Sequence, residues 1–389
     1  MVYGQTRAER ADPPEELPRG FMRGGANSIS IWALPLVLLA AAAAVFALDL
    51  GGAATRLSGL EYGFYQHAHP RPYEDSYARG HFHVRLLHID DKAAEKYGRW
   101  PWAADQLARV TEGLKKAGAP IVIYAFALDA GDPASPQRFA AQLPDDAQNA
   151  PARAALNQMI SPDEAFAESL NGIKAATGYT LADDDGDDRV SVKAPITQQG
   201  APNALNYLPR YSYALRALPL IESASTASGA LNLTPDRDGV FRSLPLVNHL
   251  GGETVPAIDL DALRAGLGAV VLHGADGTVP GLDADARLAN ISVGNTSIAT
   301  RRDSAITIWF ARDPAARVLD ASSVLGADVL PDLKNSIVIV APPGKTVRTP
   351  VGLMSVGDIH AEVLENILLG EGLTQSAGYL PQLVFLAVT

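Results

Sequence analysis

The clearest hydrophobic pattern in the chain lies between residues 84 and 126. A short apolar run, Val84–Ile89, is followed by two carboxylates and then by a polar loop. Apolar residues next recur at helical spacing, and Gly118 ends that stretch. A second apolar run, Ile121–Phe126, completes a strand–helix–strand pattern. The apolar face of the predicted helix consists of Leu107, Val110, Leu114 and Ala117.

This strand–helix–strand unit predicts where its polar ends lie. The crossover in such a unit is right-handed in nearly all cases, and its two strands run parallel. Asp90 and Asp91 follow the first strand and Asp129 follows the second, so the three carboxylates should share one edge of a sheet. In open α/β sheets, ligands tend to bind at the edge formed by the carboxyl ends of the strands. The pattern therefore predicts an acidic edge that could bind a ligand.

Further apolar and capping patterns extend the same architecture. Buried strands are predicted at Ile173–Leu181 and Ser336–Ala341. Helices are predicted at Ser161–Leu170, Pro256–Gly266 and Ile359–Leu369. The first of these begins with a serine N-cap, a proline and a glutamate, which is a strong helix start. Together these elements predict an α/β fold with a mixed, largely parallel sheet flanked by helices.

Two segments give other predictions. Asp132–Pro162 is rich in Pro, Ala, Gln and Asp and is predicted to be a loop or a mobile insertion. The run Asp236-Arg237-Asp238-Gly239 lies between two alternating stretches within Gly229–Val247. A glycine at such a turn predicts a β-hairpin.

An uncharged apolar segment near the N-terminus predicts a membrane span. Ile29–Leu48 is about the length that a helix needs to cross a bilayer. Arg19 and Arg23 precede it, which favours a cytoplasmic N-terminus with the bulk of the chain on the extracytoplasmic side. A cleaved signal peptide is the alternative, although its apolar region is usually shorter. Ala53–His69 follows with apolar residues at helical spacing and could continue the membrane helix.

A second apolar segment begins at Tyr379 and is expected to start another membrane helix, with further membrane segments and an output module beyond it. The sequence therefore predicts four regions. These are a disordered cytoplasmic tail (1–28), a transmembrane helix (29–50), an extracytoplasmic domain (51–376) and the start of a second membrane helix (377–389).

Composition narrows the possible functions. The 389 residues carry a formal net charge of −11 and no cysteine. Without clustered Lys and Arg, such an acidic chain is not expected to bind nucleic acid. The absence of cysteine excludes disulfides and cysteine-based zinc sites. Five histidines near the first strand could in principle ligate a metal, but a polar loop is the favoured interpretation, so no metal or cofactor is predicted. They are His67, His69, His81, His83 and His88.

Complete catalytic motifs are absent from the sequence. It has no nucleophile elbow, no His-Glu-x-x-His and no Gly-x-Gly-x-x-Gly after a strand. Gly344-Lys345-Thr346 resembles the end of a phosphate-binding loop, but Ile339 occupies the position of the first glycine. Asp90, Asp91 and Asp129 could serve a membrane-anchored hydrolase, or they could cap helices and fix loops. We predict no catalytic residue in this stretch.

Taken in order, four patches resemble the second CHASE family of extracytoplasmic sensor domains. Together they extend over nearly all of the chain between the two apolar segments. The patches are His88–Asp91 with Gly98–Trp102, Asp236–Arg242, Leu333–Val340 and Ile359–Leu368. The chain departs from the family where Ser355-Val356-Gly357 replaces a Pro-Gly-Val.

The resemblance implies an α/β sensor in the bacterial inner membrane, with its bulk on the periplasmic side. It implies a cytoplasmic effector, most often a class III adenylate or guanylate cyclase, with a histidine or serine/threonine kinase as the alternative. The partners expected are a small-molecule or environmental signal, the membrane and a second copy of the chain bound through membrane helices. A ligand site is predicted where carboxylates and an aromatic face suit a cationic or polyhydroxy molecule. Its residues are Asp90, Asp91, Trp100, Asp129 and His360.

Overall fold

The structure, a computed structural model, describes residues 53–183, 190, 192–275, 287–344 and 346–373. The predicted tail 1–28, the predicted membrane helix 29–50 and the apolar segment 377–389 lie outside these residues. The chain divides into two compact units, Met1–Ser58 and Gly59–Thr389. The second unit contains every element discussed below, apart from the first residues of α2. Among the described residues, no helix is both long and apolar enough to cross a bilayer.

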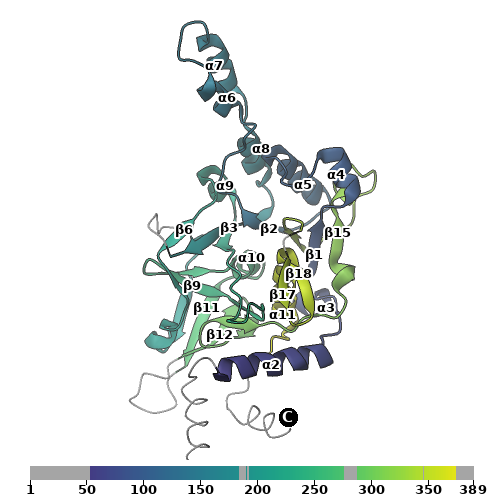
Figure 1. The fold of residues 1–389 in the computed structure, drawn as a ribbon, viewed down its shortest axis with the longest axis vertical. Coiled ribbons are helices and arrows are strands. Elements are labelled where there is room, and N and C mark those ends of the chain that lie inside the picture. The colour runs from purple at the N-terminus through teal and green to yellow at the C-terminus, as the bar shows by residue number, and fades with distance from the viewer. Residues whose placement is uncertain (1–52, 184–189, 191, 276–286, 345, 374–389) are drawn as a thin grey trace, which may run out of the picture. The chain divides into compact units, whose positions relative to one another are not determined.

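A seven-stranded sheet lies at the centre of the second unit (Figure 1). Its order is β15-β1-β16-β2-β3-β6, and β7 also pairs with β3. Every pairing is parallel except that of β6 with β3, so the mixed, largely parallel sheet is confirmed. The strands are β1 (His83–His88), β2 (Ile121–Ala127), β3 (Lys174–Ala182), β6 (Tyr213–Leu215), β7 (Ala227–Ala230), β15 (Val318–Asp320) and β16 (Ser336–Val340).

The predicted strand–helix–strand unit is present, with one addition. Strands β1 and β2 run parallel, and α5 (Ala104–Lys116) connects them as predicted. However, β16 lies between the two strands, so that Ile339 pairs with Leu86 on one side and Ile123 on the other. The loop predicted directly after β1 is in part a short helix, α4 (Asp91–Tyr97).

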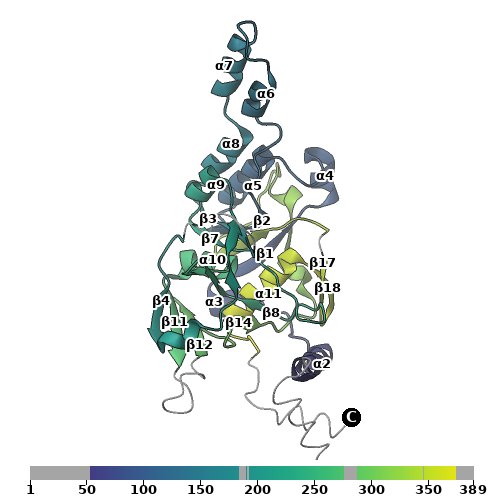
Figure 2. The ribbon, with the colours of Figure 1, turned by 60° about the vertical axis from the view of Figure 1, so that its left-hand side comes forward.

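Strand residues alternate between two buried cores, one on each face of the sheet. In β16, Ile337 and Ile339 face one core while Val338 and Val340 face the other, as the period of two requires. Helices α10 (Ile258–Leu267) and α11 (Val356–Leu369) cover the first face. The second face is covered by α4, α5, α8 (Pro162–Ser169) and α9 (Pro219–Ala224). Two helix layers therefore enclose the sheet (Figure 2).

Four smaller sheets complete the described structure. They are β5 (Arg210–Tyr211), β9 (Val247–Leu250) and β10 (Glu253–Pro256); β4 (Thr197–Gly200), β11 (Val270–Ala275), β12 (Arg287–Val293) and β13 (Thr296–Ala299); β8 (Ser243–Pro245) and β14 (Ala305–Thr307); and β17 (Thr346–Thr349) and β18 (Gly352–Ser355). The remaining helices are α2 (Ala53–Ala68), α3 (Tyr77–Gly80), α6 (Pro136–Gln142), α7 (Ala150–Gln158), and the 3₁₀ turns η2 (Pro202–Leu205), η4 (Pro314–Arg317) and η5 (Ala321–Ser323).

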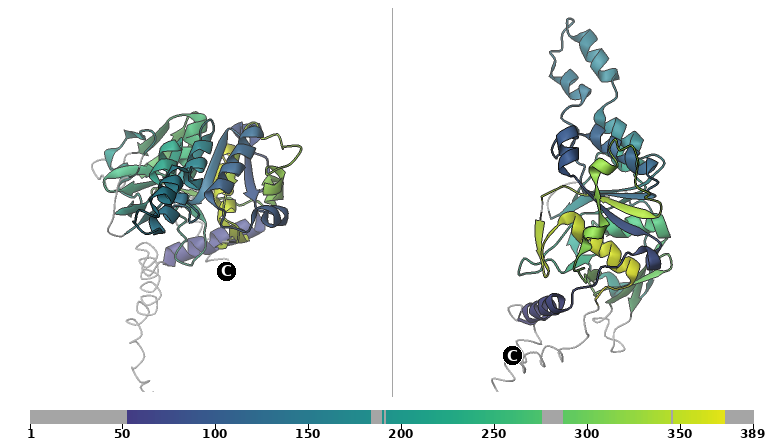
Figure 3. Two further views of the ribbon diagram at one scale, coloured as in Figure 1. Left: turned by 90° about the horizontal axis from the view of Figure 1, so that it is seen from above. Right: turned by 90° about the vertical axis from the view of Figure 1, so that its right-hand side faces the viewer.

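The predicted insertion at Asp132–Pro162 is not a structureless loop. Helices α6 and α7 pack on one another and stand beyond α8, as the right-hand view of Figure 3 shows. No residue of α7 is buried. A helix without a buried face has no apolar period, and its alanines favour helix without producing that signal. The pattern therefore could not reveal these helices.

The hairpin predicted within Gly229–Val247 is wrong, although its turn forms. The N–H of Gly239 donates to the carbonyl of Asp236 at 2.8 Å, and Gly239 has a φ of 77°. The flanking strands pair elsewhere: β7 lies parallel to β3, and β8 pairs with β14. The turn forms, but β7 pairs with β3 in the central sheet, where all of its residues are buried, instead of pairing with β8.

Candidate functional site

The two carboxylates that follow β1 differ in their surroundings. Asp90 occupies the N-cap position of α4, and its Oδ1 accepts a hydrogen bond from the backbone N–H of Ser322 at 2.9 Å. Partial burial acts to raise the pKa of Asp90, but the hydrogen bonds from Ser322 hold this pKa below its usual value. Asp91 is exposed in the first turn of α4. Asp90 therefore fixes a loop, while Asp91 is free to face solvent.

Trp100 and Asp129 lie at the same edge of the sheet. The Trp100 ring packs edge-on against Phe126 near the end of β2, with ring centroids 4.9 Å apart. Asp129 lies two residues beyond β2 and is exposed. Four of the five predicted ligand residues thus follow the carboxyl ends of β1 and β2, as the parallel topology requires. Ligand binding at this acidic edge (Asp90, Asp91, Trp100 and Asp129) stays a prediction.

His360 does not lie with the other four predicted residues. It is buried within α11, where its Nδ1 lies 2.9 Å from Oδ2 of Asp259 in α10. Helices α10 and α11 cover the face of the sheet opposite to Trp100, which packs against the core beneath α5. The sequence did not reveal which face of the central sheet α11 covers. Because α11 covers the face opposite to Trp100, His360 lies apart from the acidic edge.

Two buried carboxylates near the end of β2 hold the loops of this edge. Oδ2 of Asp132 accepts from the backbone N–H of Ala104 at 2.7 Å, which caps the first turn of α5. Oδ2 of Asp163 accepts from the backbone N–H of Asp132 at 2.9 Å. Burial raises the pKa of Asp163. These side chains are engaged in loop structure, so the exposed groups beside them are the ones open to a ligand.

A second polar site joins the N-terminal and C-terminal elements of the unit. Its centre is the bridging segment, Trp309–Ala311. On one side this segment contacts the end of α2 and the residue after it: the Phe310 N–H donates to Oε1 of Gln66 in α2 at 3.0 Å, and Nε1 of Trp309 donates to the carbonyl of His69 at 2.9 Å. The Arg71 N–H donates to the carbonyl of Phe310 at 2.9 Å, which continues this pairing.

On its other side the bridging segment is held by α11. The backbone N–H of Trp309 donates to Oδ1 of Asn366 at 2.8 Å, and Nδ2 of Asn366 donates to the Trp309 carbonyl at 3.1 Å. The Ala311 N–H donates to Oε2 of Glu362 at 3.1 Å. One short segment is therefore bonded both to the residues that follow α2 and to the last described helix.

Four fully buried charges surround the bridging segment. Arg71 and Arg317 supply two guanidinium groups, and Glu362 and Glu365 supply two carboxylates; none of the four side chains is more than 1% exposed. Their shortest contacts are Arg71 Nη2 to Glu365 Oε2 at 2.6 Å and Arg317 Nη1 to Glu362 Oε1 at 2.9 Å. Asp358, partly exposed, adds a contact of 2.9 Å to Arg317. We call these five residues the charge network.

The charge network shifts the pKa values of its members. Burial acts to lower the pKa of Arg71 and of Arg317, but attraction to the two glutamates holds both pKa values above the usual one. Burial, together with repulsion from Glu362, raises the pKa of Glu365 despite the nearby arginines. Two buried cations balance two buried anions. Removing one member would leave a buried charge without its partner.

The chain leaves α11 beside the same bridging region. Gly370 ends the helix in the left-handed conformation, with a φ of 70°. The N–H of Leu373 then donates to the carbonyl of Thr307 at 3.0 Å, two residues before the bridging segment. The last described residues are therefore bonded to the same stretch of chain as α2.

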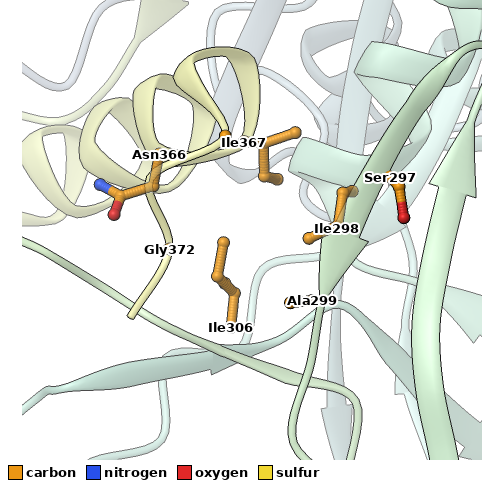
Figure 4. A pocket seen from close by; sticks show the side chains of 8 residues that line it. Ser297, Ile298, Ala299, Ile306, Asn366, Ile367 and Gly372 are labelled. Carbon is orange, nitrogen blue, oxygen red and sulfur yellow. The ribbon is translucent and has the colours of Figure 1, made fainter. Parts of the chain in front are cut away.

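A shallow hollow of about 80 Å³ lies where the end of α11 meets β13 and β14. Figure 4 shows Ile298, Ile306 and Ile367 converging on it, with Asn366 at its rim. Most small-molecule sites enclose roughly 300–1,000 Å³. The hollow is too small for the cationic or polyhydroxy ligand predicted from the sequence.

Sequence reasoning did not single out the charge network. One signal was available: Glu362 and Glu365 lie three residues apart in a helix rich in apolar residues, so both carboxylates are forced onto a largely buried surface. Such a pair needs cationic partners. The sequence could not indicate which arginines these were, because Arg71 and Arg317 are separated from α11 by long stretches of chain.

Comparisons with known proteins give one match. No curated protein and no solved structure matches the chain. The CHASE2 domain matches residues 37–388, which is most of the sequence and includes both the acidic edge and the charge network. CHASE2 domains are sensory, not catalytic, and are typically extracytoplasmic. The chain therefore belongs to the CHASE2 domain family and has a sensory input role.

Proposed function

We propose that this sensory domain is the periplasmic input domain of a transmembrane receptor in the bacterial inner membrane. It relays a small-molecule or environmental signal to a cytoplasmic effector, a class III nucleotide cyclase; a histidine or serine/threonine kinase is the alternative effector. The receptor acts as a homodimer joined through its membrane helices. The sensory family and the uncharged apolar segment Ile29–Leu48 support this proposal.

The observation that carries the proposal is the bridging segment. The end of α2 and the residue after it hold this segment through Gln66 and His69, and α11 holds it through Glu362 and Asn366. These flanking elements continue in sequence toward the two apolar segments. A displacement of α11 relative to α2 must break or rearrange these hydrogen bonds. The bridging segment is therefore suited to transmit movement between the two ends of the domain.

The acidic edge has a short physical connection to α11. Asp90 lies two residues beyond β1, and α11 packs against this strand. The contact is close at Gly357, where a Cβ atom would lie 2.6 Å from Cδ1 of Leu86 in β1. A ligand that binds Asp90 and Asp91 and displaces β1 would therefore also displace α11, because the two elements are in close contact. Binding that favours one of two arrangements would shift the population between them.

The test uses the receptor that contains this domain together with its effector, in isolated membranes. Deleting residues 59–373 should make nucleotide cyclisation independent of culture conditions. Asn366→Ala removes both side-chain hydrogen bonds to Trp309 and should change basal output several-fold. Gln158→Ala, on exposed α7, is the matched control and should leave output unchanged.

Two product assays distinguish a cyclase effector from a kinase effector, and a separate outcome would reject the proposal. Formation of cyclic nucleotide from ATP or GTP supports a cyclase, while transfer of labelled phosphate to protein supports a kinase. An output that responds to culture conditions equally well without residues 59–373 would reject the sensory input role in this receptor. Thermal unfolding of each variant checks that altered output does not come from a loss of folding.

A further inference from the structure

The described part of α2 has two dissimilar faces. On the inner face, the Tyr62 hydroxyl donates to the Ile308 carbonyl, and Gln66 accepts from the Phe310 N–H. The outer face carries Leu60 and Phe64, which are 65% and 67% exposed, and the exposed Ala68. These three residues lie at i, i+4 and i+8, so they form one apolar stripe along the helix.

Polar and aromatic residues border this stripe. Glu61 and His67 lie at its sides, and Tyr65 is 43% exposed and stacks on His69 with ring centroids 5.2 Å apart. An apolar stripe with polar borders and aromatic residues is typical of helices that lie in the interfacial layer of a membrane. The stripe lacks a cluster of Lys and Arg, so its binding would depend on apolar burial rather than on anionic lipid.

Chain connectivity limits what can cover the stripe. Only four residues, Asp49–Gly52, separate the apolar segment Ile29–Leu48 from the start of α2. Even a fully extended linker extends by at most about 3.6 Å per residue. The other described end is also close, because Leu373 pairs with Thr307, next to the residue that binds Tyr62. The apolar segment from Tyr379 follows six residues later.

We propose that the outer face of α2, formed by Leu60, Phe64 and Ala68, lies in the interfacial layer of the lipid bilayer. The partner is a lipid surface, and zwitterionic headgroups suffice. This inference rests on the proposed membrane location of the domain. It makes α2 more than a connection: lipid holds its outer face while the bridging segment holds its inner face. A change in the bilayer surface would then act directly on Tyr62 and Gln66.

The natural absence of cysteine makes the test direct. Single cysteines replace Leu60 or Phe64 in the whole chain, with Gln158→Cys on α7 as the control. Each variant is spin-labelled and reconstituted into phosphatidylcholine vesicles. Collision with oxygen, which concentrates in lipid, is compared with collision with a water-soluble nickel complex. At positions 60 and 64 oxygen should dominate several-fold; at position 158 the nickel complex should dominate.

Other outcomes would overturn the inference. Strong nickel collision at positions 60 and 64 would place the stripe in water. Weak collision with both reagents would mean that protein covers it, and magnetic coupling between labels would then identify a second copy. Alkaline carbonate extraction distinguishes the proposed membrane location of the domain from the proposed lipid contact of α2. Release of the chain from membranes would reject both, whereas a retained chain with water-exposed labels would reject only the lipid contact of α2.

Discussion

The acidic edge and the charge network use the same kind of side chain in opposite ways. At the edge, Asp91 and Asp129 are exposed and make no demand on the fold. In the network, Glu362 and Glu365 are fully buried and require two arginines from distant parts of the chain. A carboxylate in water keeps its hydration, while a buried one must replace it with partners. Exposure therefore leaves the edge available to a ligand, and burial makes the network structural.

In the proposed mechanism, this difference also separates ligand binding at the acidic edge from transmission through the charge network. A ligand can exchange with water at the edge without disturbing the core. The charge network and the bridging segment, by contrast, join α11 to the end of α2 and the residues that follow it, so that movement of one helix acts on the other. The four predictions below test whether the acidic edge and the charge network differ in this way.

The largest expected effect is that of Arg317→Ala. This change leaves Glu362 and Glu365 with one arginine between them and removes the arginine that Asp358 contacts; removal of one partner from a buried pair typically costs about 3–5 kcal/mol. Urea unfolding followed by tryptophan fluorescence measures the loss. The exposed pair of Arg109 with Asp105 supplies the control, because Arg109→Ala should change the free energy of unfolding by less than about 0.5 kcal/mol.

A paired substitution sharpens this result. Arg71→Met together with Glu365→Gln removes one buried cation and one buried anion, whose atoms lie 2.6 Å apart. The double variant should lose less stability than the sum of the two single variants, since no buried charge is left without a partner. Strict additivity of the two losses would show that these charges do not act as one network.

An intermediate effect is expected for Asp90→Ala, which removes the hydrogen bond from Ser322 and should cost about 1 kcal/mol at pH 7. The folded-state pKa of Asp90 lies below its unfolded value. Its contribution is therefore fully present above the usual pKa of aspartate, about 3.9, and is lost as pH falls through the folded value. The stability difference between the wild type and this variant should narrow accordingly in acid.

Asp90→Asn gives the control for this titration. It keeps an oxygen that can accept from Ser322, so its loss at pH 7 should be smaller than that of the alanine variant. If the difference in unfolding free energy between the wild type and Asp90→Ala stays constant from pH 7 to pH 3, the charge of Asp90 contributes nothing to stability.

The smallest effects are expected for Asp91→Ala and Asp129→Ala. Both side chains are exposed, and surface substitutions away from caps and networks usually change stability by less than about 0.5 kcal/mol. Thermal unfolding of the variants checks this. If these two carboxylates bind a ligand, each variant should also lose the rise in melting temperature that this ligand gives the wild type. If either variant loses several kcal/mol of unfolding free energy in the absence of ligand, that carboxylate stabilises the fold, as those of the charge network do.

Much of the fold could be predicted because its signals are local. The apolar runs that became β1, β2, β3 and β16, and the helical spacing that became α5, depend only on neighbouring residues. The capping box at Ser161 formed as its spacing predicts. Local signals failed where a competing partner was distant: β7 paired with β3 instead of forming a hairpin, and β16 entered between β1 and β2.

The site divides in the same manner. Asp90, Asp91, Trp100 and Asp129 could be placed from the sequence, because parallel strands bring their carboxyl ends to one edge. His360 could not, because its position depends on which face of the sheet α11 covers. Arg71 and Arg317 could not either, since nothing in their neighbourhoods indicates which carboxylates they meet.

The sequence by itself determined the class of fold, the sensory family and the acidic edge, all of which follow from periodicity, strand order and short motifs. Only the tertiary structure decided that the last helix is joined to the residues after α2 through buried charges and the bridging segment. The physical reason is that burial is a property of the assembled chain. A glutamate in an apolar helix has no defined partner until the fold removes it from water.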